Sequence, residues 1–269
     1  MHRFEINSLE IKTDKLPAHC PGFKFAFMSD LHSNEYKIDL DALKSELDSE
    51  APDAVLIGGD MINKRVKDDP TISANLIADI ASAHRVFYAL GNHEYQLKVF
   101  DEDYNHRFRD YSAFLKELGV SFLDDEDVLF EKEGTSIRIF GLSLDFAFYM
   151  RKYEVVMGPG LIKHHIGNAD KDNFNLLLAH NPKYFENYAE WGADLVLSGH
   201  VHGGIIRLGK KGVISPDLKL FPYFDGGMYE CDSSRMLLSR GIGTHSIPIR
   251  INNRPELNIV SIVSSKALH

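Results

Sequence analysis

The chain has 269 residues, 44% of them hydrophobic and 26% charged, which is the balance of an ordinary folded protein with a substantial core. Its 30 Lys and Arg residues against 39 Asp and Glu residues give a formal charge of −9. That charge disfavours extended nucleic acid as a partner, because neutralising phosphates with Lys and Arg supplies most of the affinity for nucleic acid.

Cysteine usage and the N-terminal sequence bear on the compartment. Cys20 and Cys231 are too few and too far apart for a disulfide framework, which favours a reducing environment. The opening stretch MHRFEINSLEIKTDKLP has no apolar run typical of a signal peptide. No segment approaches the ~20 apolar residues of a membrane span. We therefore expect a cytoplasmic protein without an integral membrane span.

Short apolar runs rich in Val, Ile, Leu and Phe alternate with helix-like segments along most of the chain. Such runs predict strands that are buried on both faces of a sheet. The predicted strands cover 22–28, 53–59, 85–90, 136–142, 173–179 and 193–199. Helical spacing or helix-start signals mark 38–50, 68–84, 111–120 and 183–192. In the second of these helices, Asp69 is the predicted N-cap and Pro70 the first helical residue.

The segment 124–141 breaks this alternation. Two β-rich runs flank the turn-like sequence EKEG, which predicts an antiparallel hairpin. The last third of the chain is also strand-like, in the runs IIRL, RMLLSR and ELNIVSIV. Alternating strands and helices together with antiparallel segments predict mixed sheets in an α/β (α+β) fold. No linker, repeat or low-complexity tract divides the sequence, so we expect one domain over residues 1–269.

Polar residues of the kinds that bind metals follow five of the predicted strands. In open α/β sheets, ligands collect outside the carboxyl ends of the strands. If these strands lie side by side, their polar ends converge on one patch. The residues in question are Asp30, His32, Asp60, Asn92, His93, His180, His200 and His202.

Carboxylate, amide and imidazole donors in this mixture suit Mn, Fe, Zn or Ni, and contain too much nitrogen for Ca or Mg. Without His93, the set still has seven side chains, more than one tetrahedral ion uses. Two ions about 3.5–4 Å apart that share a carboxylate would account for them, and would clamp the attacking and leaving oxygens of an in-line displacement. Such a pair also acidifies a shared water toward neutrality. We therefore expect hydrolysis at phosphorus by a metal-activated hydroxide.

Each of these short motifs is common when it stands alone and is then usually structural. Their order along the chain, each after a predicted strand, favours the metal site. The other histidines lack this context, and we expect ordinary structural or surface roles for them, with His164 and His165 in a loop. They are His2, His19, His84, His106, His164, His165, His245 and His269.

The blocks SDLHS, GGDMIN, GNHEY, LLLAHNP and SGHVHGG, in this order, resemble the five signature blocks of the calcineurin-like metallophosphoesterases. The C-terminal sequence SRGIGTHSIPIRINNRPELNIVSI is similar to the bacterial YkuE-like phosphodiesterase branch of that superfamily. The resemblance covers essentially residues 22–263. It implies a four-layer sandwich of two stacked mixed β-sheets flanked by helices, with metals at the strand ends.

The resemblance also implies roles for individual residues. The first metal would be held by Asp30, His32, Asp60 and His202. The second would be held by Asp60, Asn92, His180 and His200. Asp60 would bridge the two divalent ions, for which Mn is the expected occupant in vitro, and His93 would contact the phosphate and assist the leaving oxygen. The sequence departs from the family pattern at Glu94, Val201 and Ile205, none of which is an implied ligand.

The function that these features predict is hydrolysis of a small or lipid-like phosphate ester or pyrophosphate, most simply by a phosphodiesterase. A nuclease of the same superfamily is an alternative that the acidic charge opposes. A non-catalytic metal-binding scaffold is another, opposed by the complete set of ligands. Aromatic residues in 146–153 and 221–229 either shape a substrate pocket or pack loops. The sequence does not identify a protein partner.

Overall fold

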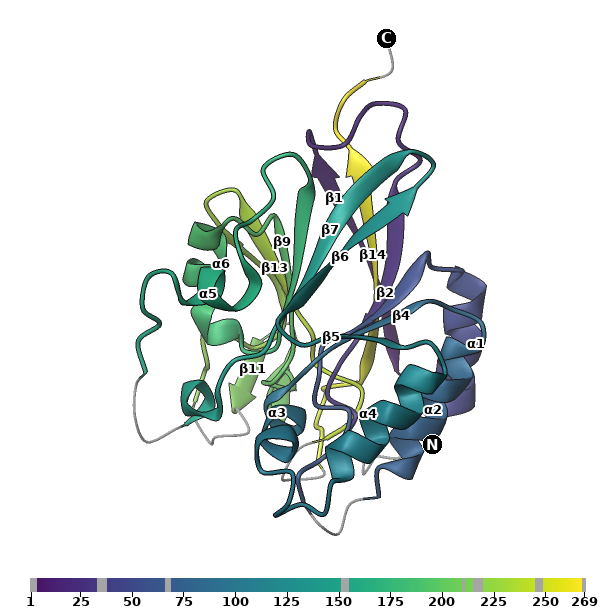
Figure 1. Cartoon of the computed structure of the whole chain (residues 1–269), viewed down its shortest axis with the longest axis vertical. Coiled ribbons are helices and arrows are strands. Elements are labelled where there is room, and N and C mark those ends of the chain that lie inside the picture. Colours follow the sequence, from purple (N-terminus) through teal and green to yellow (C-terminus); the bar gives the residue numbers. More distant parts are fainter. Residues whose placement is uncertain are drawn as a thin grey trace.

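The computed structural model describes residues 4–32, 38–65, 69–150, 155–209, 211–214, 220–244 and 249–267. Within these ranges the strands form two six-stranded sheets and one small hairpin sheet. The two large sheets face each other (Figure 1), with α1, α2 and α4 on the outside of one and α5 and α6 on the outside of the other. The fold is therefore the expected four-layer sandwich with two mixed sheets.

The first sheet contains the strands that precede the Asp30, Asp60 and Asn92 turns. In spatial order its strands are β1 (Glu5–Thr13), β14 (Glu256–Ser264), β2 (Phe23–Met28), β3 (Ala54–Ile57), β4 (Val86–Ala89) and β5 (Ser121–Leu123). Strands β2 to β5 are parallel, whereas β14 runs antiparallel to β2 and carries β1 at the edge. The helices on its outer face are α1 (Leu40–Glu50), α2 (Thr71–Ala81) and α4 (Arg107–Glu117).

The second sheet contains the strands that precede the three ligand histidines of the C-terminal half. Its order is β12 (Gly227–Cys231), β13 (Ser234–Leu238), β9 (Leu195–Ser198), β8 (Phe174–Ala179), β7 (Thr135–Leu142) and β6 (Glu126–Lys132). Its central four strands are parallel, and β12 and β6 form antiparallel edges. The helices α5 (Leu161–Ile166) and α6 (Phe185–Trp191) cover its outer face.

The space between the sheets is filled by apolar side chains from both. Phe25, Leu56 and Phe87 of the first sheet pack against Phe130 and Leu176 of the second. Every residue of β3, β4, β8 and β9 is buried, because each strand has this core on one face and helices on the other. This double burial explains why the strands appear in the sequence as continuous apolar runs, and it fixes the turns at their ends.

All six predicted strands and the hairpin are present, and two details of the helices differ from expectation. The helix α2 begins at Thr71 with Pro70 as its capping residue, while the Asp69 carboxylate accepts a hydrogen bond from Thr71 N at 2.9 Å. Asp69 thus closes a local Asx turn before the helix and is not its N-cap. His164 and His165 lie in α5 and not in a loop.

Strand β1 was not predicted, because it is an edge strand with one half-exposed face and alternates polar with apolar residues. In the part of the chain that the structure describes, no helix combines the length and the apolar character needed to cross a bilayer.

Candidate metal centre

The predicted ligands come together at one end of the sandwich, but from both sheets. Asp30 and Asp60 follow β2 and β3, and Asn92 opens helix α3 (Asn92–Val99) after β4. His180 follows β8 in the other sheet, and His200 and His202 follow β9. Hydrogen bonds join the two sets of turns. The His180 ring lies 2.6 Å from the Gly58 carbonyl, and His200 N donates to Asp30 Oδ1 at 3.0 Å.

The turns that carry the ligands have an unusual backbone. Left-handed φ values are uncommon for residues other than glycine and cost on the order of 1–3 kcal/mol each where they occur in a folded protein. Five of the seven predicted ligands have them: Asp30 (57°), His32 (46°), Asp60 (54°), His200 (76°) and His202 (54°). The surrounding structure therefore holds these side chains in fixed directions.

Two glycines let the carboxylates lie directly against neighbouring backbone. A Cβ atom on Gly91 would lie 2.2 Å from Asp60 Oδ1, and one on Gly199 would lie 2.3 Å from Asp30 Oδ2. Both distances are far below normal van der Waals contact, so neither position accommodates a side chain while the carboxylate stays in place. Gly91 thus helps to position Asp60, and Gly199 helps to position Asp30.

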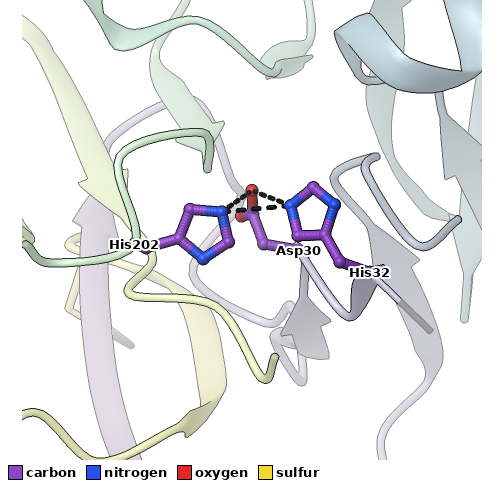
Figure 2. Close-up of side chains that lie close together, drawn as sticks. All are labelled: Asp30, His32 and His202. Atoms are coloured by element: carbon purple, nitrogen blue, oxygen red, sulfur yellow. Dashed lines mark hydrogen bonds and ion pairs between the residues drawn. The ribbon is translucent and has the colours of Figure 1, made fainter. Parts of the chain in front are cut away.

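Asp30, His32 and His202 form the first cluster. Figure 2 shows the two imidazole rings on either side of the Asp30 carboxylate, with their Nε2 atoms turned toward it. Asp30 Oδ1 lies 3.4 Å from His202 Nε2 and 3.9 Å from His32 Nε2, and the two Nε2 atoms are 3.1 Å apart. All three side chains are buried. Three donor atoms converging on one point are suited to a shared metal ion.

Asp60, His180 and His200 form the second cluster. Since His180 Nδ1 faces the Gly58 carbonyl, it carries the ring proton in the neutral tautomer and leaves a lone pair on Nε2. That Nε2 atom is buried and makes no hydrogen bond, although it lies 3.1 Å from Asp60 Oδ2. Asn92 Oδ1 is also buried without a hydrogen bond. Buried acceptors of this kind are costly unless a ligand satisfies them, so both fit a metal ion.

Asp60 connects the two clusters. Its Oδ2 atom lies 3.8 Å from His32 Nε2 in the first cluster and 3.1 Å from His180 Nε2 in the second. Its Oδ1 atom accepts a hydrogen bond from His93 N at 2.9 Å. One buried carboxylate therefore faces donors of both clusters, as a bridging ligand would.

Because two carboxylates are buried in the centre, positive charge is strongly favourable there. Burial raises the pKa of Asp30 to about 6, against the opposing effect of His180. Burial acts in the same direction on Asp60, but His180 and His93 outweigh it and hold the pKa of Asp60 well below its usual range. For His180, burial opposes the charged form, yet Asp60 and Asp30 raise its pKa to about 10. The two carboxylates thus favour positive charge at this position, which a divalent cation can supply.

His93 lies beside the ligands with a different hydrogen-bond partner. Its Nδ1 atom accepts a hydrogen bond from Lys64 N at 3.0 Å, so the neutral ring carries its proton on Nε2. His93 Nε2 lies 3.9 Å from Asp60 Oδ2 and is close enough to His32 and Asp60 to form a third three-residue group with them. The fixed tautomer makes His93 a hydrogen-bond donor toward the centre.

Glu94 is a structural part of the centre that the sequence showed only as a departure from the family pattern. Its buried carboxylate accepts hydrogen bonds from one hydroxyl and four backbone amides. The donors are Asp60 N (2.8 Å), Met61 N (2.7 Å), Ile62 N (3.2 Å), Gly91 N (3.2 Å) and Tyr88 Oη (2.7 Å). Burial raises the pKa of Glu94 to about 7, with a further contribution from Asp60. Glu94 thus holds the turn that carries Asp60.

Asn253 was not identified from the sequence at all. Its buried side chain donates to the carbonyls of His202 at 2.7 Å and Gly204 at 2.6 Å. Asn253 lies 51 residues from His202 in the chain, within the C-terminal sequence 239–262 that resembles the YkuE-like branch, but that resemblance implied no role for it. Only the folded structure reveals that it fixes the His202 turn.

The two aromatic segments have different surroundings. In the first, the Tyr149 ring lies 5.1 Å from the His200 ring and 6.2 Å from the His180 ring, so this segment borders the second cluster. Tyr153 of the same segment lies outside the described residues, as do His2, His245 and His269. In the second segment, Phe224 and Tyr229 pack against each other at 5.0 Å.

Comparison with known proteins agrees with this geometry. The profile of the family described as calcineurin-like phosphoesterase matches residues 23–204. The Bacillus subtilis protein YpbG is 32% identical over 243 residues, which cover 90% of this chain and 82% of YpbG. The metallophosphoesterase YkuE of the same organism is 26% identical over 276 residues, covering 98% of this chain and 87% of YkuE.

Among solved structures, the phosphopantetheinyl hydrolase PptH of Mycobacterium tuberculosis is similar with a TM-score of 0.46 and 12% identity. The match covers 82% of this chain and 89% of PptH. Similarity at this level supports no inference about the chemistry of the present chain.

Proposed function

The chain belongs to the calcineurin-like phosphoesterase family, and on that premise we propose that it is a phosphodiesterase with a two-metal centre. Its substrate would be a small or lipid-like phosphate ester or pyrophosphate. The observation that carries this proposal is the pair of clusters between which the buried Asp60 carboxylate lies. A single ion would leave the donors of one cluster unused.

The assignment of ligands follows the two clusters. The first half-site comprises Asp30, His32, Asp60 and His202. The second comprises Asp60, Asn92, His180 and His200. This donor set suits Mn, Fe, Zn or Ni, and Mn is the ion we propose for reconstitution. When bound, the two ions supply Lewis acidity toward the phosphate and acidify a water to near neutral pH.

The protein's own groups have defined tasks in this proposal. His93, with its proton on Nε2, donates a hydrogen bond to the phosphate and stabilises the negative charge that develops on the leaving oxygen. The Gly58 carbonyl orients the His180 ring, and Glu94 and Asn253 hold the turns of Asp60 and His202. These contacts exist before substrate binds, so little reorganisation is needed during the reaction.

We also propose that residues 1–269 act as one domain in a reducing, cytoplasmic compartment. Two observations support this. The interior between the sheets includes side chains from β2 near the start of the chain and β14 near its end, such as Phe25 and Ile262. Cys20 and Cys231 are both free thiols.

A substrate panel with the Mn-reconstituted protein tests the proposal. It should compare an aryl phosphodiester, an aryl monoester, a nucleotide diester, a sugar-nucleotide pyrophosphate and single-stranded DNA at one moderate salt concentration. We expect the small diester to be cleaved and DNA to be a poor substrate. Efficient, salt-sensitive DNA cleavage would instead establish the nuclease alternative, and metal binding without hydrolysis of any substrate would establish the scaffold alternative.

A further inference from the structure

A concentration of exposed apolar side chains lies next to the metal centre in the chain. Six large hydrophobic side chains among the described residues are more than half exposed, and five of them fall in 208–223 or at Ile249. Tyr223 is 81% exposed and Phe221 is 70% exposed. Single exposed apolar residues are ordinary, but a contiguous group usually marks an interaction site.

Backbone pairing joins these residues into one small sheet. Strand β10 (Ile206–Leu208) pairs with β11 (Lys211–Ile214), and Ile206 also forms a bridge with Ile251. On the other side, Ile214 forms a bridge with Leu220, and Phe221 N donates to Val213 O at 2.9 Å. Segments from three parts of the chain therefore lie side by side.

Alternation along the strands places the apolar residues on one face. Residues paired across strands, and residues two apart along a strand, point to the same side of a sheet. Ile251 lies on the same side of the sheet as Ile206, with which it pairs, and as Ile249, two residues earlier. Leu208 lies on this side because it is two residues after Ile206, and Leu220 lies on it because it pairs with Ile214, the partner of Ile206. Arg207 points to the opposite side, where it is buried and donates to Gly203 O at 2.9 Å. The exposed residues Leu208, Leu220, Ile249 and Ile251 are called the apolar face below.

The charges around the apolar face are positive, although the chain as a whole carries −9. Lys211 pairs directly with Leu208, and Arg254 lies three residues after Ile251. Both are exposed, and the described residues provide neither with an ion-pair partner. Asp225, which is half-buried, accepts a hydrogen bond from Gly212 N at 2.5 Å.

We infer that the apolar face docks the protein on an anionic lipid surface. Exposed Leu and Ile side chains beside the exposed Lys211 and Arg254 match the apolar interior and negative head groups of such a surface. A two-fold contact with a second copy fits less well, since it would bring each Lys211 and Arg254 near the same charges of the partner.

The apolar face is connected to the metal centre through the chain and a hydrogen bond. Strand β10 starts four residues after His202, and Asn253, two residues after Ile251, binds the His202 carbonyl. Docking would therefore place the centre next to the lipid head groups. Resting on the proposed function, this favours an amphiphilic phosphate ester as substrate.

Cosedimentation of the whole protein with vesicles tests the inference. The vesicles contain phosphatidylcholine with or without phosphatidylglycerol, at low and at high salt. We expect binding to the anionic vesicles that weakens in high salt. The double variant Leu208→Ser/Leu220→Ser should bind at least about tenfold more weakly, because it removes two large apolar side chains from the contact. Lys211→Glu should weaken binding only to the anionic vesicles.

The matched control is Phe114→Ser/Leu118→Ser, which alters two exposed apolar residues at helix α4 and its C-terminal end, and should bind as the wild type does. All variants should hydrolyse a soluble aryl phosphodiester at the wild-type rate. No binding by the wild type, or equal binding by the Leu208/Leu220 variant, would overturn the inference. So would a dimer in sedimentation velocity that this variant abolishes, since the second copy would then be the occupant. Failure to hydrolyse any soluble ester would instead count against the proposed function.

Discussion

The substitution Gly199→Ala gives a sharp test of how the centre is built. The new methyl group would lie 2.3 Å from Asp30 Oδ2 and 2.7 Å from Ser29 Oγ. Comfortable contacts of a methyl carbon are roughly 3.5 Å, so the carboxylate has to move by about 1 Å. The backbone of Gly199 is not in the left-handed region, so the effect comes from the collision alone.

The size of the effect follows from that displacement. Misplacing a group by about 1 Å can cost on the order of 10²-fold in rate, and disturbing the support of a metal ligand costs about 10–100-fold in metal affinity. Overpacking would also lower the free energy of unfolding by about 1–3 kcal/mol. We expect a folded variant with reduced metal content after dialysis and a rate about 10²-fold lower on an aryl phosphodiester.

Gly158→Ala is the matched control, because its new methyl group meets nothing within 4 Å and its φ is also ordinary. Elemental analysis, steady-state rates and thermal unfolding of both variants complete the assay. If Gly199→Ala retained wild-type metal content and rate, Asp30 would not be a ligand held in the position that the structure shows.

Three further predictions concern the same centre. Asp60→Ala should lose both metals together with activity. His93→Ala should keep its metals and lose about 10²–10⁴-fold in rate, most severely for substrates with poor leaving groups. Release of metal from His93→Ala would contradict the assigned roles. Glu94→Ala leaves four buried amides without their acceptor and should lower the free energy of unfolding by about 4 kcal/mol even if water satisfies half of them. The exposed Glu117→Ala should change it by less than about 0.5 kcal/mol in the same urea titration, and equal effects would refute the role of Glu94. Removing metal with a chelator should lower the melting temperature, and adding Mn should restore it, because a bound ion stabilises only the folded state; an unchanged melting temperature would mean that the clusters hold no ion.

The sequence predicted the parts of the fold that local pattern determines. Strands such as β3 and β8 are buried on both faces, and their unbroken apolar runs show this directly. The ligand residues could be predicted for the same reason, since each follows such a run. Strand β1 was missed because its alternating pattern depends on pairing with β14, at the far end of the chain.

Other features depend on contacts that no local pattern encodes. We expected the candidate ligands to converge because their strands lie side by side in one sheet. The structure does bring these residues close together, but from two sheets that meet across the sandwich. Glu94 could be seen only as a departure from the family pattern, because its five donors come from three separate turns or strands. The bond from Asn253 to His202 spans 51 residues, and neither local sequence indicates that the two residues are in contact. The roles of His93 and of the individual ligands remain predictions.

The metal stoichiometry of active protein tests the central proposal most directly. Protein reconstituted with Mn and freed of excess ion should contain close to two ions per chain by elemental analysis. Activity on an aryl phosphodiester should rise as the second equivalent of Mn occupies the half-site that contains Asn92, His180 and His200. Full activity at one ion per chain would contradict the two-metal centre, because the buried donors of one cluster would then have no part in the reaction.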